Sequence, residues 1–210
     1  MQLNLPKIIP VFPLSGVIFF PKTNLPLNIF ESRYLTLIND CVKSNKYMGM
    51  IQLKGNTSDV YSVGCLGKIT QHKKTKDGRI LVNLTGISRF EINSEINNDK
   101  IYREFEVSYE KFTEDQEQKE KQTIILEKIK ETHQKTKIFF KKNGLLLNWV
   151  EFEKLDEDQK INTLAMIAPI SNEEKQTILE SVHINSKSTV LSEIIEFYLH
   201  EKSTNNITLQ

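Results

Sequence analysis

The chain has 210 residues, of which 39% are hydrophobic and 26% are charged, and its formal net charge at pH 7 is +1. This composition is typical of a globular protein that buries a core without disulfides, and the charge balance excludes a global field that would attract nucleic acid or an anionic membrane. The N-terminus lacks the pattern of a signal peptide, and no run reaches the roughly 18 apolar residues of a membrane-spanning helix. We therefore expect a cytoplasmic protein in which Cys41 and Cys65 are buried thiols.

The first half of the chain has the apolar pattern of β-strands. Proline and glycine separate its first three apolar runs, 8–14, 17–20 and 25–30. Asp77-Gly78 predicts a hairpin with a tight primed turn, because this pair adopts the positive φ angles that such a turn needs. Period-two alternation predicts further strands, in the segments 47–53, 60–72, 80–92 and 101–112.

One helix interrupts the β pattern after residue 30. Glu31 is expected in its first turn, where the helix dipole favours a negative charge. Apolar residues then recur at helical spacing and form one face, made of Tyr34, Leu37, Ile38, Cys41 and Val42.

The second half of the chain has helical periodicity. Ser171 and Glu174 form the pattern of a capping box, which predicts the start of a helix. The other predicted helices are 114–142, 156–168 and 186–200, and the apolar stripe of the first contains Ile125, Ile129, Thr132, Thr136 and Phe140. The change of period near residue 113 indicates an α+β architecture, with a β-rich part in 1–112, a helical bundle in 113–201 and a flexible tail in 202–210.

A series of short motifs gives the chain a family resemblance. In the β-rich half these are Pro10-Val11-Phe12-Pro13-Leu14, Phe20-Pro21, Leu25-Pro26-Leu27, Ile29-Phe30-Glu31, Arg33-Tyr34, Val63-Gly64 with Gly67, Asp77-Gly78-Arg79, and Gly86 with Arg89-Phe90. In the helical half they are Glu174-Lys175-Gln176 and Leu179-Glu180. Taken in this order, the motifs resemble the N-terminal, substrate-binding domain of Lon proteases, including its stand-alone members, over nearly the whole chain.

The resemblance implies a fold and a function. The fold is a PUA-like, β-rich pseudo-barrel with one embedded helix, followed by a C-terminal helical bundle. In full-length Lon this domain contributes to recognising unfolded or tagged substrates and to assembly. The sequence ends before a Lon ATPase or peptidase domain would begin, so we expect a stand-alone binding module.

The sequence lacks the patterns of common catalytic sites, which also indicates a binding module. The segment from Gly64 to Lys68 is too short for a phosphate loop, and Ile69 stands where a hydroxyl residue would hold magnesium. No segment resembles the serine–lysine peptidase of Lon. Glu180 and His183 have the spacing of a metal-binding pair without the second pair that a di-iron bundle needs. We therefore expect no enzyme activity, no cofactor and no metal.

Two binding functions remain from the residues themselves. The hairpin around Lys73 and Arg79 is basic, which offers an RNA- or nucleotide-binding alternative, although a solvated turn explains it more simply. The apolar residues around Phe19 and Met48 exceed what one sheet face needs, and burial in the core is their simpler explanation. The candidate peptide contacts are Phe19, Phe20, Arg33, Tyr34, Met48 and Met50.

The sequence thus predicts a non-catalytic module that binds protein segments. Its expected partners are unfolded or tagged proteins in protein quality control, with a separate protease or chaperone as a further candidate. Nucleic acid and membranes are not expected partners.

Overall fold

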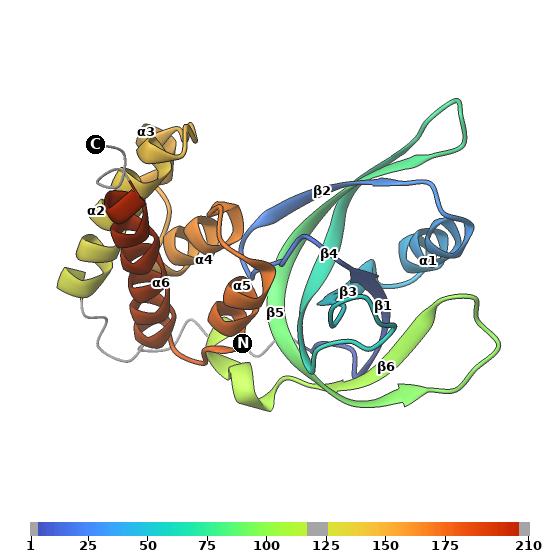
Figure 1. Cartoon of the computed structure of the whole chain (residues 1–210). Coiled ribbons are helices and arrows are strands. Elements are labelled where there is room, and N and C mark those ends of the chain that lie inside the picture. Colours follow the sequence, from blue (N-terminus) through green and yellow to red (C-terminus); the bar gives the residue numbers. More distant parts are fainter. Residues whose placement is uncertain (1–3, 117–125, 206–210) are drawn as a thin grey trace. The chain divides into compact units, whose positions relative to one another are not determined.

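The computed structural model describes residues 4–116 and 126–205 of the chain. The chain divides into two compact units, Met1–Lys119 and Glu120–Gln210. The described part of the first consists mostly of strands, and that of the second consists of helices (Figure 1). The predicted α+β class is therefore confirmed, whereas the domain boundary at residue 113 stays a prediction about which segments fold independently.

The first unit is built on a six-stranded mixed sheet with the order β2-β5-β4-β3-β1-β6. A further pairing between β5 and β6 closes the sheet into a barrel, and β1 pairs with β3 in parallel. The strands are β1 Ile8–Leu14, β2 Asn24–Ile29, β3 Tyr47–Gln52, β4 Val63–Lys74, β5 Ile80–Ile96 and β6 Arg103–Ser108. Helix α1 (Ser32–Lys43) connects β2 to β3, and the short 3-10 helix η1 (Glu110–Asp115) follows β6.

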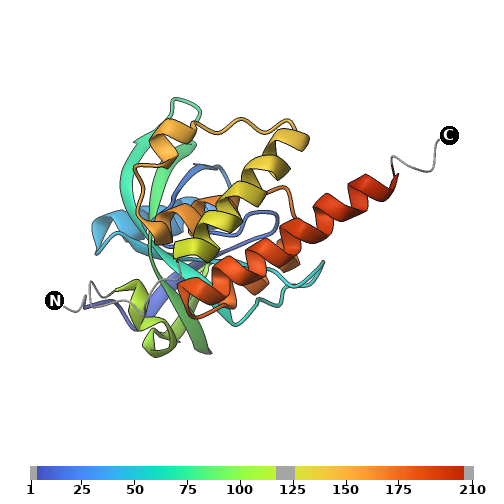
Figure 2. The same cartoon turned by 90° about the vertical axis from the view of Figure 1, so that its left-hand side faces the viewer.

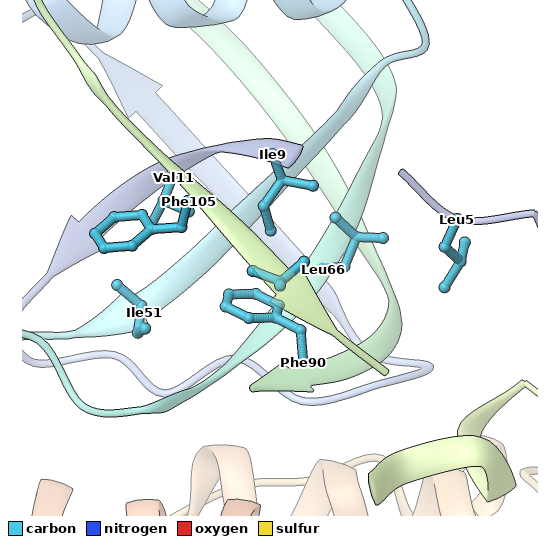
Figure 3. Packing of buried hydrophobic residues seen from close by; sticks show 8 residues of the cluster. Leu5, Ile9, Val11, Ile51, Leu66, Phe90 and Phe105 are labelled. Carbon is cyan, nitrogen blue, oxygen red and sulfur yellow. The ribbon is translucent and has the colours of Figure 1, made fainter. Parts of the chain in front are cut away.

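Alternating side chains fill the interior of the barrel. Along β5, the residues Ile80, Val82 and Leu84 are buried, while their sequence neighbours are more exposed, as period-two alternation predicts. Figure 3 shows how residues from distant strands meet at this core. Its buried cluster consists of Leu5, Ile9, Val11, Ile51, Leu66, Phe90, Phe105 and Val107.

The apolar run 17–20 is a loop in the structure, with Val17 exposed and Ile18, Phe19 and Phe20 buried. Phe20 is fully buried, and the loop that follows it is held to β5 by backbone hydrogen bonds. The Lys22 N–H donates to the Gly86 carbonyl at 2.9 Å, and the Gly86 N–H donates to the Thr23 carbonyl at 2.9 Å. A Cβ atom at position 86 would lie 2.2 Å from the Phe20 carbonyl oxygen. The close backbone approach therefore requires glycine at this position.

A buried ion pair fixes η1 to the barrel. Arg89 on β5 donates from Nε and Nη2 to the two carboxylate oxygens of Asp115, at 2.9 and 2.8 Å. The Arg89 backbone N–H also donates to Asp115, and the guanidinium lies 4.3 Å from the ring centroid of Phe112. The side chains of Arg89 and Asp115 are only 1% and 7% exposed. Arginine and aspartate are thus both part of the packed interior.

Two local predictions in the first unit need correction. The hairpin at Asp77-Gly78 is present, but its turn is not a primed one, because Asp77 is not among the two described non-glycine residues with positive φ. Gly78 has a φ of +86° and its N–H donates to Thr75, which is the geometry of a three-residue loop with a bulge. Glu31 is the N-cap of α1, one residue before the first turn, and its side chain makes no capping hydrogen bond.

The described helices of the second unit are α2 Leu126–Lys142, α3 Trp149–Phe152, α4 Glu157–Ile167, α5 Asn172–Glu180 and α6 Ile184–Asn205. The predicted capping box of Ser171 and Glu174 is confirmed, and Asp156 with Gln159 forms another. The predicted start of a helix at Glu114 is wrong, because this residue belongs to η1. Ile125, which was assigned to the stripe of that helix, lies outside the described residues, and the short α3 was not predicted.

Helices α2 and α6 lie side by side (Figure 2). Where the two helices meet, the hydroxyl oxygens of Thr132 on α2 and Ser188 on α6 are 2.9 Å apart, and both residues are buried. Further along, Lys135 donates to the carboxylate of Glu196 at 2.9 Å. The contacts advance toward the C-terminus along both helices, so the two helices run in the same direction. Lys142, near the end of α2, therefore lies at the same end of the helix pair as the second half of α6.

Helix α2 also carries a histidine that makes folding depend on pH. Burial lowers the pKa of His133 from its usual 6.5, and the positive charge of Lys160 lowers it further, while the carboxylates of Glu157 and Glu153 act in the opposite direction. Its Nε2 atom finds no hydrogen-bond partner in the described part of the chain. The folded state therefore prefers the neutral ring, and the unfolded state binds the proton more readily.

We expect the free energy of unfolding to fall as the pH drops from about 7 to about 5, through the unfolded pKa of His133. Urea titrations across this range, on the wild type and on His133→Gln, measure the effect. The variant should lose less stability on acidification. Equal losses in the two proteins would contradict this role of His133.

Candidate binding surfaces

Five of the six predicted peptide contacts lie in the interior of the first unit. Phe19 and Phe20 are buried in the loop beside β5, and Met48 and Met50 lie on β3, where their exposed fractions are 0% and 3%. Tyr34 stacks on Phe12 with the ring centroids 3.9 Å apart. In this conformation these five side chains are packing residues and offer a ligand almost no surface.

Arg33 is the one predicted contact at the surface. Its side chain is 56% exposed and makes an ion pair of 3.0 Å with Glu31. Its guanidinium also lies 4.5 Å from the ring centroid of Tyr34. Arg33 thus joins the N-terminus of α1 to the aromatic pair beneath it, and a ligand contact by this residue stays a prediction.

A groove lies on the sheet of the first unit, where β2, β5 and β4 run next to one another. Its volume is about 650 Å³. The strand register places Pro26, Asn83 and Gln71 in one row across the three strands. Asn28, Leu81 and Lys73 form the next row on the same face. Leu81 is 44% exposed at the centre of this row.

The second unit contains a continuous row of aromatic rings. It begins at Phe152, which packs edge-on against His133 at 5.5 Å between ring centroids. Successive centroids along the row are 5.3 to 6.5 Å apart, the spacing of favourable aromatic pairs. The row runs through Phe152, Trp149, Phe140, Phe139, Tyr198 and Phe197.

The loop over one part of this row leaves apolar side chains in solvent. Leu146 is 100% exposed and Val150 is 72% exposed, and Leu145 is partly exposed beside them. Trp149 is anchored to Phe140 by the aromatic row, and the N–H of Leu145 donates to the Phe140 carbonyl at 3.0 Å. We call residues 145–150, which include the first two residues of α3, the apolar loop. Its exposed leucines and valine thus lie next to Trp149, which packs into the aromatic row.

Lysines flank the apolar loop. Lys137 lies over the Trp149 ring at 5.2 Å from the centroid, and the exposed Lys141 and Lys142 end α2. Sequence reasoning missed this loop because it ended one helix at Gly144 and began the next at residue 156. The sequence signal that could have revealed the loop is a cluster of three leucines and a tryptophan in residues 145–150, a segment without helical or strand periodicity.

The folded chain thus combines a closed β-barrel unit that carries a groove and a helical unit that carries the exposed apolar loop. A family model described as the ATP-dependent protease La (LON) substrate-binding domain matches residues 8–196. The chain therefore belongs to the Lon substrate-binding domain family, as the sequence motifs indicated.

Curated relatives carry the same domain within longer proteins. The chain is 28% identical to the Lon protease of Desulfosudis oleivorans over 192 residues, which are 86% of this chain and 23% of that protein. It is 36% identical to the Lon protease of Elusimicrobium minutum over 95 residues, which are 42% of this chain and 11% of that protein. The chain thus spans a quarter or less of the relatives that it matches, and their protease name describes the full-length proteins.

Solved structures show the same fold. A Lon N-terminal domain protein from Xanthomonas campestris superposes with a TM-score of 0.61 at 21% identity, covering 86% of this chain and 94% of that one. The N-terminal domain of a Lon protease from the Mycobacterium avium complex gives a TM-score of 0.64 at 17% identity, covering 90% of this chain and 98% of that one. The alternative of an RNA- or nucleotide-binding protein finds no support in these similarities.

The described residues contain neither a candidate metal centre nor a membrane-spanning helix. Within residues 4–116 and 126–205, no cluster of three histidine, cysteine, aspartate or glutamate side chains is placed to hold a metal ion. None of the helices in those ranges is long and apolar enough to cross a membrane.

Proposed function

We propose that this chain is a non-catalytic binding module that captures unfolded segments of other proteins through the apolar loop. The exposure of Leu146 and Val150 carries the proposal. A protein gains stability by burying such side chains, so leaving them in solvent is expected where a partner covers them. Membership in the Lon substrate-binding family supports a protein as that partner.

The construction of the loop supports binding to many different segments. Trp149 and Phe152 are in edge-to-face contact at 5.3 Å, which fixes the base on which the apolar side chains stand. In the proposed binding mode, the loop contacts a segment through its exposed side chains, Leu146 and Val150. Such a surface recognises hydrophobicity and not a particular sequence, which suits a role in protein quality control in the cytoplasm, with a protease or chaperone acting on the captured protein.

A binding titration tests the proposal. Fluorescence anisotropy with labelled, reduced and carboxymethylated α-lactalbumin, which stays unfolded, reports the affinity of the purified chain. Replacing both Leu146 and Val150 by serine should weaken binding about tenfold or more, since burial of one aliphatic side chain contributes about 1.5–3 kcal/mol. Both side chains are exposed, so the unfolding midpoint should remain that of the wild type.

The matched control removes apolar surface elsewhere. Phe30 and Ile101 in the first unit are 65% and 60% exposed. Replacing both by serine should leave the affinity within about twofold of the wild type, because a factor of two is less than 0.5 kcal/mol. Equal weakening by the two double variants, or no binding by the wild type, would contradict capture by the apolar loop.

A further inference from the structure

The groove on the sheet of the first unit is a different kind of surface from the apolar loop. Its centre is Leu81, which is 44% exposed, and the exposed Pro26 lies diagonally across from it on β2. The amide side chains of Asn28, Asn83 and Gln71 surround these two residues. The groove therefore offers a small apolar floor inside a ring of hydrogen-bonding groups.

The groove is lined by basic residues and by no acidic ones. The residues that line it include Lys73 and His72 and no aspartate or glutamate. Within the part of the chain that the structure describes, Lys73 has no ion-pair partner, although neighbouring Arg79 is paired with Asp77 at 3.0 Å. Lys73 occupies the same cross-strand row as Leu81, directly opposite it on β4. Leu81, which offers an apolar contact, and Lys73, which offers a positive charge, are thus nearest neighbours on the sheet.

The edge of the sheet limits how a ligand lies. Strand β2 pairs with β5 alone among the described strands, so its other side is a free edge. Pro26, in the middle of β2, has no N–H to donate, and proline at such an edge interrupts the addition of a further strand. A ligand therefore gains more by lying over the face of the sheet, on Leu81 and the amides, than by extending the sheet.

We propose that this groove binds an extended segment of a protein in which an apolar side chain lies next to an aspartate or glutamate. The apolar side chain covers Leu81, and the carboxylate pairs with Lys73. Among the described residues, the side-chain amides of Asn28 and Gln71 form no hydrogen bond, so they are available to bond the segment's main chain. The inference rests on the proposed function for the class of ligand, a protein segment, but it concerns a separate surface on the other unit.

A charge-swap experiment tests this site. Two labelled ten-residue peptides in a Gly-Ser frame contain one leucine followed by either glutamate or lysine, and their affinities for the full chain are measured by fluorescence anisotropy. The wild type should bind the glutamate peptide about fivefold more tightly than the lysine peptide, from one partly desolvated ion pair. Lys73→Glu should invert this order, and Leu81→Ser should weaken both peptides.

The control is Lys43→Glu, an exposed lysine on α1 that makes the same change in net charge. It should keep the preference of the wild type for the glutamate peptide. The inference is overturned if Lys73→Glu and Lys43→Glu behave alike, or if the wild type binds the two peptides equally. A chain that captures unfolded α-lactalbumin yet shows no charge preference would refute the groove and leave the proposed function standing. If the wild type fails to capture α-lactalbumin but Lys73→Glu still inverts the preference between the two peptides, the proposed function alone is refuted.

Discussion

Replacing Arg89 by alanine is expected to lower the free energy of unfolding by about 3–5 kcal/mol, the largest effect of any single side chain that we describe. The substitution removes both charge-assisted hydrogen bonds to Asp115, at 2.8 and 2.9 Å. It leaves the Asp115 carboxylate almost fully buried without its counter-charge. The contact with the Phe112 ring is lost as well, so η1 should detach from the barrel.

Urea unfolding of three variants measures this effect and separates its causes. Lys111→Ala removes an exposed ion pair with Glu91 in the same unit and should cost less than about 1 kcal/mol. The double variant Arg89→Met/Asp115→Leu removes both charges and should recover part of the stability that Arg89→Ala loses. A loss of under about 1 kcal/mol in Arg89→Ala would show that the pair does not hold η1 to the sheet.

Replacing Gly86 by alanine is expected to cost about 3 kcal/mol, at the upper end for an added methyl group. The new Cβ would lie 2.2 Å from the Phe20 carbonyl oxygen and 3.0 Å from the Pro21 Cα. These are backbone atoms, so no side-chain rotation relieves the clash. The loop would have to move away from β5, which would break its two hydrogen bonds to Gly86 and expose Phe20.

Thermal or urea unfolding compares this variant with Asn93→Ala, an exposed position on the same strand. The control should stay within about 0.5 kcal/mol of the wild type. Hydrogen exchange adds a local reading, since the amides of Lys22 and Gly86 should lose protection in Gly86→Ala. Wild-type stability together with unchanged protection would contradict the close approach of the loop.

Much of the fold follows from local sequence patterns. The face of α1, the hairpin at Gly78 and the capping box at Ser171 are each specified by residues within one turn or one strand of each other. The closure of the barrel is not specified in this way. The predicted strand ended at residue 92, whereas β5 continues to Ile96, and this extension supplies much of the pairing with β6.

Long-range polar partners leave even less trace in the sequence. Arg89 and Asp115 are 26 positions apart, and each lies in a segment whose periodicity has another explanation. Nothing local distinguishes an arginine that is buried against a carboxylate from one at the surface. The family motif Arg89-Phe90 drew attention to the position without revealing its partner.

Local sequence also fails to distinguish an apolar pair that is buried from one that is exposed. Phe19-Phe20 and Leu145-Leu146 are both pairs of large apolar residues outside regular helices and strands. The first pair is covered by the barrel and the second is open to solvent. Whether an apolar pair is core or surface depends on what the rest of the chain places over it, and that information lies far away in the sequence. Two of the six predicted contacts, Phe19 and Phe20, therefore belong to the covered pair, and none belongs to the exposed one.

Capture of unfolded proteins by the apolar loop can be tested by mapping where such a protein touches the chain. Reduced and carboxymethylated α-lactalbumin that carries a photoreactive benzophenone can be cross-linked to the purified chain, and the attachment sites read by mass spectrometry. We expect attachment to be concentrated in the apolar loop, residues 145–150, and to be lost when Leu146 and Val150 are replaced by serine. Attachment that avoids this loop, or that persists unchanged in the double variant, would contradict capture by the loop.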